Sequence, residues 1–279
     1  MEPFAPQTPM PPASGQAGLL HLAPWASFAG LTAGFTSRHG GFSEAPWRSL
    51  NTALHVGDAD DAVVRNRRLV AETLGWTFEA WTCAEQVHGA RVHVVRETDR
   101  GAGKMSRDAA IRDADALVTD EPDVLLAMFF ADCVPLYFYD PRRGALGLAH
   151  AGWKGTVKDV AGETVRTMAA VYGTDPADLH AAIGPSIGAC CYEVDEAVLT
   201  HVRQIAADGD GRFYTGRDEG KANLDLKEIN RHLMIKAGIL PSRIEMSTWC
   251  TSCRTDLFFS HRKERGQAGR MMSWLGKRN

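Results

Sequence analysis

The sequence predicts an α/β protein in which layered mixed β-sheets are covered by helices. Strand and helix patterns alternate along most of the chain, which favours this class. A long apolar hairpin in the middle of the chain adds antiparallel pairing, so a pure parallel Rossmann sheet is not expected. With 279 residues, 44% of them hydrophobic, the chain can bury a sizeable core.

Strands are predicted where short apolar runs lie between turn residues, at positions 30–37, 91–95, 116–119, 125–139, 144–150, 179–183 and 244–247. Helices are predicted where apolar side chains recur at helical spacing, at positions 60–74, 156–172, 195–206 and 226–237. Asp195 is expected to cap the third of these helices, and Gly173 to end the second.

Two segments lack an apolar period. The first dozen residues contain five prolines, so residues 1–18 are predicted to form a disordered tail and residues 19–279 a single domain. Residues 97–113 combine two glycines with mixed charges and lie between two candidate metal-ligand segments. They form either a lid over the site or an ordinary solvated loop.

Composition narrows the class of protein. A formal net charge of -3 gives no general attraction to nucleic acid or to membranes. No apolar run approaches the roughly 20 residues that span a bilayer, and the N-terminus lacks the pattern of a signal peptide. Six cysteines in so long a chain do not indicate a disulfide framework. A cytoplasmic protein with reduced thiols is therefore expected.

His88, Cys133 and His150 form the strongest candidate site in the sequence. Cys133 and His150 belong to the two arms of the apolar hairpin. If Tyr139 pairs with Gly144 across the turn, Cys133 falls opposite His150. Two imidazoles and a thiolate suit Zn²⁺, or copper where it is available, and leave a fourth position for water or substrate. Packing roles for these residues are the alternative, because free cysteine is often buried.

Glycine-bearing turns lie close to this set. Gly152, Gly155 and Thr156 lead into the predicted helix, where free N–H groups and the positive end of the dipole favour an anion. A second such turn, at 184–189, follows a strand. Each turn either binds phosphate or a ribose hydroxyl, or is a tight turn that only needs glycine.

Two polar residues allow two interpretations. Asp132 precedes Cys133, so in an extended strand it points to the opposite face and supports the site only if the strand bends. Asn51 is either an amide of the site or a turn former.

The other cysteine pairs, at 190–191 and 250–253, are expected to be structural thiols. Cys250 and Cys253 form a C-x-x-C motif, but the adjacent pair has the wrong spacing to complete a zinc ribbon. Free cysteine commonly packs as a small hydrophobic residue.

The motifs resemble those of the YfiH family, in order and approximate spacing, from about Phe35 to the C-terminus. The residues that carry the resemblance are Gln86-Val87-His88-Gly89, Asp115-Ala116-Leu117-Val118-Thr119-Asp120, Ala131-Asp132-Cys133-Val134-Pro135, His150-Ala151-Gly152-Trp153-Lys154-Gly155, Ala182-Ile183-Gly184-Pro185-Ser186-Ile187-Gly188 and Phe258-Phe259-Ser260-His261-Arg262. That family has been labelled a laccase-like polyphenol oxidoreductase and, later, a purine nucleoside phosphorylase. The resemblance implies the layered fold above and adenosine, inosine and 5′-methylthioadenosine as substrates.

The resemblance also covers three polar residues. Arg38 lies in a turn similar to the family's Ser-Arg-x-Gly-Gly and would grip phosphate, with solvated surface as the alternative. His261 and Arg262 follow two phenylalanines in a pattern similar to the family's C-terminal motif. That pattern places them at the end of a buried strand, facing the site.

The hypothesis that follows is a zinc-dependent purine nucleoside enzyme. The ion would lower the pKa of its water toward neutrality, and hydroxide attack at C6 would deaminate adenosine. The phosphorolysis implied by the resemblance uses phosphate to attack the ribose C1′. The catalytic candidates are Cys133, Asp132, His261 and Arg262, and the substrate-binding candidates are Arg38, Asn51, Gly152 and Gly155.

Three other functions remain open. A copper-dependent polyphenol oxidase is the laccase-like alternative, although the chain has no His-x-His pair. A Cys–His hydrolase that edits peptidoglycan would use Cys133 as nucleophile and His150 as base, without metal. A zinc-stabilised, non-catalytic binding module would unfold when its metal is removed.

Overall fold

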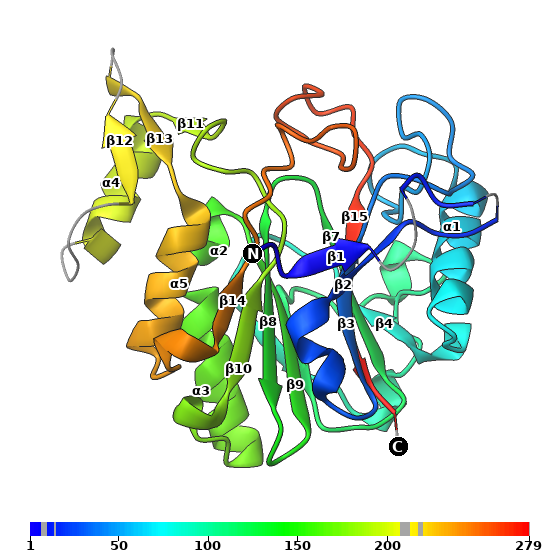
Figure 1. Cartoon of the computed structure of the whole chain (residues 1–279), viewed down its shortest axis with the longest axis horizontal. Helices are drawn as coiled ribbons and strands as arrows, with labels where there is room; N and C mark the ends of the chain where they lie inside the picture. The colour runs from blue at the N-terminus through cyan, green and yellow to red at the C-terminus, as the bar shows by residue number, and fades with distance from the viewer. Residues whose placement is uncertain (7–9, 14, 207–212, 217–219, 279) are drawn as a thin grey trace.

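Two six-stranded mixed sheets stack on one another, and helices cover their outer faces (Figure 1). The computed structural model describes residues 1–6, 10–13, 15–206, 213–216 and 220–278. In Figure 1, α1 lies beside the first sheet, while α3 and α5 lie beside the second. This arrangement confirms the predicted layered α/β class.

The first sheet has the strand order β1 (Phe4–Pro6), β2 (Leu19–Leu22), β3 (Leu31–Thr36), β15 (Met271–Lys277), β7 (Leu125–Phe130) and β4 (Trp81–Cys83). The second has the order β14 (Ile244–Met246), β10 (His180–Ile183), β8 (Val134–Asp140), β9 (Ala145–Ala151), β6 (Ala116–Thr119) and β5 (Val92–Val94). A small antiparallel sheet contains β11 (Glu193–Val194), β13 (Ala222–Leu224) and β12 (Tyr214–Gly216). The helices are α1 (Asp60–Thr73), α2 (Trp153–Val157), α3 (Val160–Tyr172), α4 (Glu196–Ala206) and α5 (Leu226–Lys236).

Alternation along β8 shows how the layers are built. Tyr137 and Tyr139 belong to the core between the two sheets, whereas Leu136 and Phe138 belong to the core under α3 and α5. Successive side chains of a strand point to opposite faces, and here both faces are buried. The Tyr137 hydroxyl donates a hydrogen bond across the layer to the Gly34 carbonyl oxygen, at 2.8 Å.

The predicted hairpin is wrong in two respects. The stretch 125–139 is two strands in different sheets, β7 and β8, and the chain passes between them through Asp132, whose φ is 83°. The register also differs: Tyr139 pairs with Leu146, and Pro135 pairs with His150. The shift is two positions, so the side chains keep their faces.

The predicted helix at 156–172 is interrupted. It consists of α2 and α3, separated by Asp159 with a φ of 58°, and the Asp159 carboxylate accepts a hydrogen bond from the Gly162 N–H. The local cap ends one helix and starts the next. The remaining helices and most predicted strands start and end within two residues of their expected positions. Gly173 ends α3 as predicted. The Asp195 carboxylate accepts a hydrogen bond from the Val198 N–H, as expected of a residue that caps α4.

Residues 97–113 pack beside the first sheet. Arg67 of α1 donates hydrogen bonds to the carbonyl oxygens of Gly103 and Lys104, at 2.7 and 3.0 Å. Ile111 forms a β-bridge with Ala84. The segment lines neither of the two cavities described below, so this arrangement supports the ordinary loop over the lid.

The segment predicted to be a disordered tail contains a strand in its described part. Phe4 pairs with Leu22 in β1, and its ring is fully buried, 5.6 Å from that of Tyr137. The Glu2 carboxylate accepts hydrogen bonds from Ser247 and Thr248. Proline density indicated disorder because the sequence does not show that one aromatic side chain reaches the core.

Phe4→Ala is therefore expected to lower the free energy of unfolding by about 3 kcal/mol, the range for removal of a buried aromatic ring. Denaturant unfolding followed by circular dichroism measures the effect. Phe42→Ala, at a position 41% exposed, serves as the control and should change stability by less than about 1 kcal/mol. Equal, small changes in the free energy of unfolding for both variants would instead support the predicted disorder of the N-terminal segment.

Candidate metal centre and adjoining cavities

His88, Cys133 and His150 come together at one end of the second sheet. Their candidate ligand atoms all lie within 4.8 Å of one another, and the two imidazole rings meet edge to face with centroids 4.8 Å apart. Donors bind zinc at about 2.0 to 2.3 Å, so atoms at this separation can close on one ion. His150 is buried and His88 is exposed, which leaves one side of the set open to solvent.

Cys133 reaches His150 from a loop. It lies between β7 and β8, beyond the end of the strand pair rather than opposite His150 as predicted. The observed register would continue to Gly152, and a Cβ at Gly152 would lie 3.0 Å from the Cys133 Sγ and 3.1 Å from the His88 Cδ2. Only glycine leaves room there for the ligand side chains and an ion.

Asp115 organises this set. Its carboxylate lies 2.9 Å from the His150 Nδ1 and accepts hydrogen bonds from the N–H groups of Val87, His88 and Gly89 at 3.1, 2.9 and 2.6 Å. The contact assigns the Nδ1 proton to the side facing Asp115 and leaves the Nε2 lone pair for a metal. The residue is fully buried.

The turn that carries His88 is held from its other side by Gln86. The Gln86 side chain exchanges two hydrogen bonds with the Phe129 backbone, at 2.8 and 2.9 Å. Gln86 and His88 both have left-handed backbone conformations, with φ of 61° and 60°. A backbone of this kind persists only where its surroundings fix it, and Asp115 and Phe129 do so.

The site favours a thiolate. Burial opposes ionisation of Cys133, but the charge and hydrogen bond of His150, together with His88, lower the pKa of the thiol to about 6. Burial likewise opposes protonation of His150, but Cys133 and Asp115 raise the pKa of the imidazole to about 9. The Cys133 thiolate therefore faces a protonated His150 imidazole. A bound metal ion would replace the proton on the His150 Nε2.

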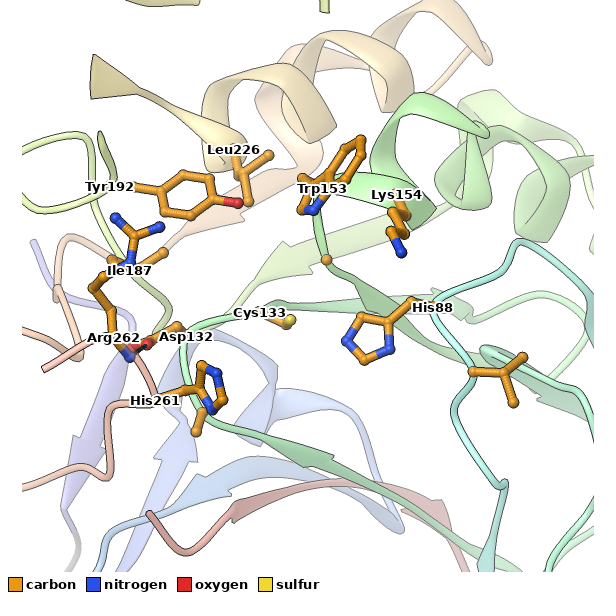
Figure 2. A pocket seen from close by; sticks show the side chains of 13 residues that line it. His88, Asp132, Cys133, Trp153, Lys154, Ile187, Tyr192, Leu226, His261 and Arg262 are labelled. Carbon is orange, nitrogen blue, oxygen red and sulfur yellow. Dashed lines mark hydrogen bonds between the residues drawn. The ribbon is translucent and has the colours of Figure 1, made fainter. Parts of the chain in front are cut away.

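Two cavities meet at this cluster. The larger, of about 370 Å³, has a mainly apolar and aromatic wall that includes Trp153, Ile187, Tyr192 and Leu226. Figure 2 shows Tyr192, Leu226 and Trp153 on one side of this cavity, across from Cys133 and His88. Its size and lining are typical of a site for a small organic ligand.

The smaller cavity, of about 270 Å³, is more polar. It contains His55 and Arg270 and shares His88, Cys133 and His261 with the larger cavity. The sequence did not identify His55, Arg270 or Tyr192 as site residues, because each reaches the site from a separate segment without a motif that marks it. Trp153 lay inside the His150 motif, but nothing in the sequence showed that its ring lines a cavity. Asp115 lay inside a quoted motif, but its role depends on contacts that cross the sheet.

Asp132 lines the larger cavity, but its carboxylate is engaged by the loops beside it. Because the chain bends at Asp132, its carboxylate accepts hydrogen bonds from the Thr251 and Ser260 hydroxyls at 2.7 and 3.1 Å and from the Arg262 N–H at 2.7 Å. These contacts hold the loop that carries His261. Asp132 therefore positions other site residues.

His261 and Arg262 lie in a turn rather than at the end of a strand, and both line the larger cavity. The Arg262 guanidinium lies over the Tyr192 ring, 5.0 Å from its centroid, and donates to the Glu193 carbonyl oxygen. The predicted location facing the site is thus observed, although the predicted strand is not.

Arg38 and Asn51 do not line either cavity. Arg38 pairs with Glu264 at 3.0 Å and donates to backbone carbonyl oxygens of the same C-terminal loop. The fully buried Asn51 accepts a hydrogen bond from the Arg270 N–H at 2.9 Å. Both residues support the loop from which His261 and Arg270 reach the site.

The glycines near His150 differ in role from the expected anion site. Gly152 lines the larger cavity, whereas a Cβ at Gly155 would lie 3.0 Å from the Gly89 carbonyl oxygen. The helix that starts here, α2, has only five residues, too few to build the dipole expected of a long helix. Close packing explains Gly155.

Comparison with known proteins agrees with this geometry. A family model described as multi-copper polyphenol oxidoreductase laccase matches residues 32–278. The purine nucleoside phosphorylase YlmD of Geobacillus stearothermophilus is 47% identical over 251 residues, which cover 90% of this chain and 92% of that protein. A Bacillus subtilis protein of the same name is 43% identical over 248 residues, 88% of each chain.

Solved structures show the same fold. The crystal structure of YlmD from Geobacillus stearothermophilus has a TM-score of 0.93 and 44% identity over the full length of both chains. The crystal structure of a hypothetical protein YfiH from Bacillus licheniformis has a TM-score of 0.91 and 45% identity, covering 94% of this chain and 97% of the other. The resemblance to the YfiH family is confirmed.

Asp115→Asn is expected to weaken metal binding at the cluster by about 10- to 100-fold, the usual effect of removing a carboxylate behind a histidine ligand. Competition with a chromophoric chelator measures it. Asp140→Asn is the matched control, since Asp140 is also buried and caps a backbone turn through the Arg142 and Arg143 N–H groups, in the β8–β9 turn. Equal affinities of the two variants would show that Asp115 does not orient a ligand.

Proposed function

The chain belongs to the family described as multi-copper polyphenol oxidoreductase laccase, and within it we propose that this protein is a zinc-dependent purine nucleoside phosphorylase. The observation that carries the proposal is the pair of cavities, one aromatic and one cationic, that share His88, Cys133 and His261. Relatives named purine nucleoside phosphorylase support it. Adenosine, inosine and 5′-methylthioadenosine are the proposed nucleosides, and the proposal includes adenosine deamination at the same site.

The larger cavity suits the nucleoside. A purine is flat and aromatic, and Tyr192 and Trp153 offer rings against which a base can stack. The stacked contact between Arg262 and Tyr192 holds one of these rings in place. The ribose would then point toward the shared boundary of the two cavities.

The smaller cavity suits phosphate. The Arg270 Nη1 donates to the Ala268 and Gly269 carbonyl oxygens, and the rest of its guanidinium would bind phosphate oxygens through two parallel hydrogen bonds. The backbone of Arg270 is held by Asn51, so the cation is pre-organised. An oxygen of phosphate attacks the ribose C1′, the bond from C1′ to the base nitrogen breaks, and the base leaves with a proton.

His88, Cys133 and His150 would hold the metal, and a bound zinc ion would supply Lewis acidity where the two substrates meet. Asp115 keeps the His150 ring in the orientation that ligation requires. His261 lines both cavities, and burial lowers its pKa, so its neutral imidazole is placed to relay the proton of the attacking hydrogen phosphate to the departing base. A compartment that keeps thiols reduced, such as the cytoplasm, suits a site with a free thiolate ligand.

Three alternatives predict different results. Among the described residues the only histidine-containing ligand cluster is a single three-residue set, which disfavours a copper oxidase with several copper ions. A Cys–His hydrolase draws support from the lowered pKa of Cys133. A binding module stabilised by zinc would share the ligands but not the reaction.

Cys133→Ala should lower the zinc content by one ion per chain and phosphorolysis of inosine by about a thousandfold or more, since several kcal/mol of stabilisation are lost. Elemental analysis and release of hypoxanthine measure the two effects. Cys83→Ala, at a buried thiol outside the cluster, is the control. Loss of activity with zinc retained would favour the hydrolase, and a zinc-loaded intact chain without phosphorolysis would favour the binding module.

Arg270→Gln and Arg262→Gln should separate the two substrates. Loss of the Arg270 cation is expected to raise the KM for phosphate by about tenfold or more and to spare adenosine deamination, which uses water in place of an anion. Arg262→Gln should instead raise the KM for the nucleoside. Steady-state kinetics with each substrate varied in turn measure this, and the opposite pattern would reverse the assignment of the cavities.

A further inference from the structure

Four cysteine side chains outside the candidate metal centre lie together. Cys190 and Cys191 come from the turn after β10, and Cys250 and Cys253 come from the loop after β14. Their Sγ atoms all lie within 4.8 Å of one another. The Cys253 Sγ is 3.5 Å from that of Cys190 and 3.4 Å from that of Cys191. A disulfide is about 2.05 Å long, so none of these pairs is bonded.

We propose that these four thiols bind a second zinc ion in a structural site. Zinc bonds to sulfur are about 2.3 Å long, so a tetrahedron of thiolates has sulfur atoms about 3.8 Å apart. The observed separations lie around this value. The sequence favoured structural thiols because the adjacent Cys190 and Cys191 do not match the spacing of a zinc ribbon. In the structure, however, the turn brings the Sγ atoms of both cysteines close to those of Cys250 and Cys253.

The backbone around the four thiols is already arranged. Gly188 donates its N–H to the Cys250 Sγ at 3.2 Å, and its carbonyl oxygen accepts from the N–H groups of Cys191 and Tyr192. A Cβ at Gly188 would lie 3.3 Å from the Cys190 Sγ. Ser186 and Cys250 form a β-bridge, so the two loops are aligned before any ion binds.

A buried cation lies close to the thiols. Lys227 of α5 donates to the carbonyl oxygens of Ser247 and Trp249 at 2.8 and 3.2 Å. Burial lowers the pKa of Lys227, and the charges of Asp225, Cys250 and Cys190 oppose this shift. A zinc ion with four thiolates has a net charge of about minus two, and a neighbouring ammonium offsets part of it.

The second ion would stabilise one wall of the larger cavity. Cys191 directly precedes Tyr192, and Cys250 and Cys253 lie on the loop that continues to His261 and Arg262. With four thiolate ligands the ion has no open position, so its role is structural. It would tie the segment that carries Tyr192 to the segment that carries His261.

Elemental analysis of protein purified under reducing conditions tests the proposal. The intact chain should contain two zinc ions, Cys133→Ala one, Cys253→Ser one, and the double variant none, while Cys83→Ala keeps two. Cys253→Ser should also lower the melting temperature and retain measurable phosphorolysis, because the catalytic cluster is intact. A single ion in the intact chain that is lost in Cys133→Ala would overturn the proposal.

A second test uses Cys133→Ala loaded with Co²⁺ in place of zinc. This variant keeps all four thiols of the proposed site, so the test does not require the Cys253 variant to fold. One Co²⁺ ion per chain with the intense ligand-field bands of a tetrahedral tetrathiolate is expected. A native disulfide between the two loops, found by mass spectrometry of unreduced peptides, or iron in place of zinc, would contradict the assignment. The metal content is measured without any activity assay. If the protein proves to lack phosphorolysis, the result for the second zinc ion still stands.

Discussion

The candidate site depends first on the buried carboxylate of Asp115. Its oxygens accept three N–H groups of the turn that carries His88 and face the Nδ1 of His150. One side chain therefore sets both the position of one ligand and the ring orientation of another. A buried carboxylate is costly unless its oxygens are satisfied, so the same contacts stabilise the fold and order the site.

The seam between the two sheets gives the site its third ligand and its cavities. The chain leaves the first sheet at the end of β7 and enters the second at β8, and the bend at Asp132 leaves Cys133 outside regular pairing. The C-terminal loop fills the opposite side of the seam, held by Asp132 and Arg38. Substrate-sized space thus forms where strand pairing ends and side chains from several segments converge.

The two cysteine-containing clusters differ in the exposure of their surroundings and in donor type. The first combines two imidazoles with one thiolate and opens into two cavities, which suits chemistry. In the proposed second site four cysteine Sγ atoms would bind one ion and leave no open position, which suits a fixed link between loops. Both clusters adjoin the larger cavity, because Cys133 lines it and Tyr192, which also lines it, directly follows Cys191.

The sequence by itself determined the layered α/β class, the bounds of most helices and strands, and His88, Cys133 and His150 as candidate metal ligands, because periodicity and local motifs carry that information. Tertiary structure decided the rest. The buried position of Phe4 depends on contacts with distant segments. The register of β8 and β9 and the break between α2 and α3 depend on turn and cap contacts that the apolar period does not encode. Arg270, Tyr192 and the four-thiol cluster likewise arise only when separate loops meet, since no local pattern encodes which loops become neighbours.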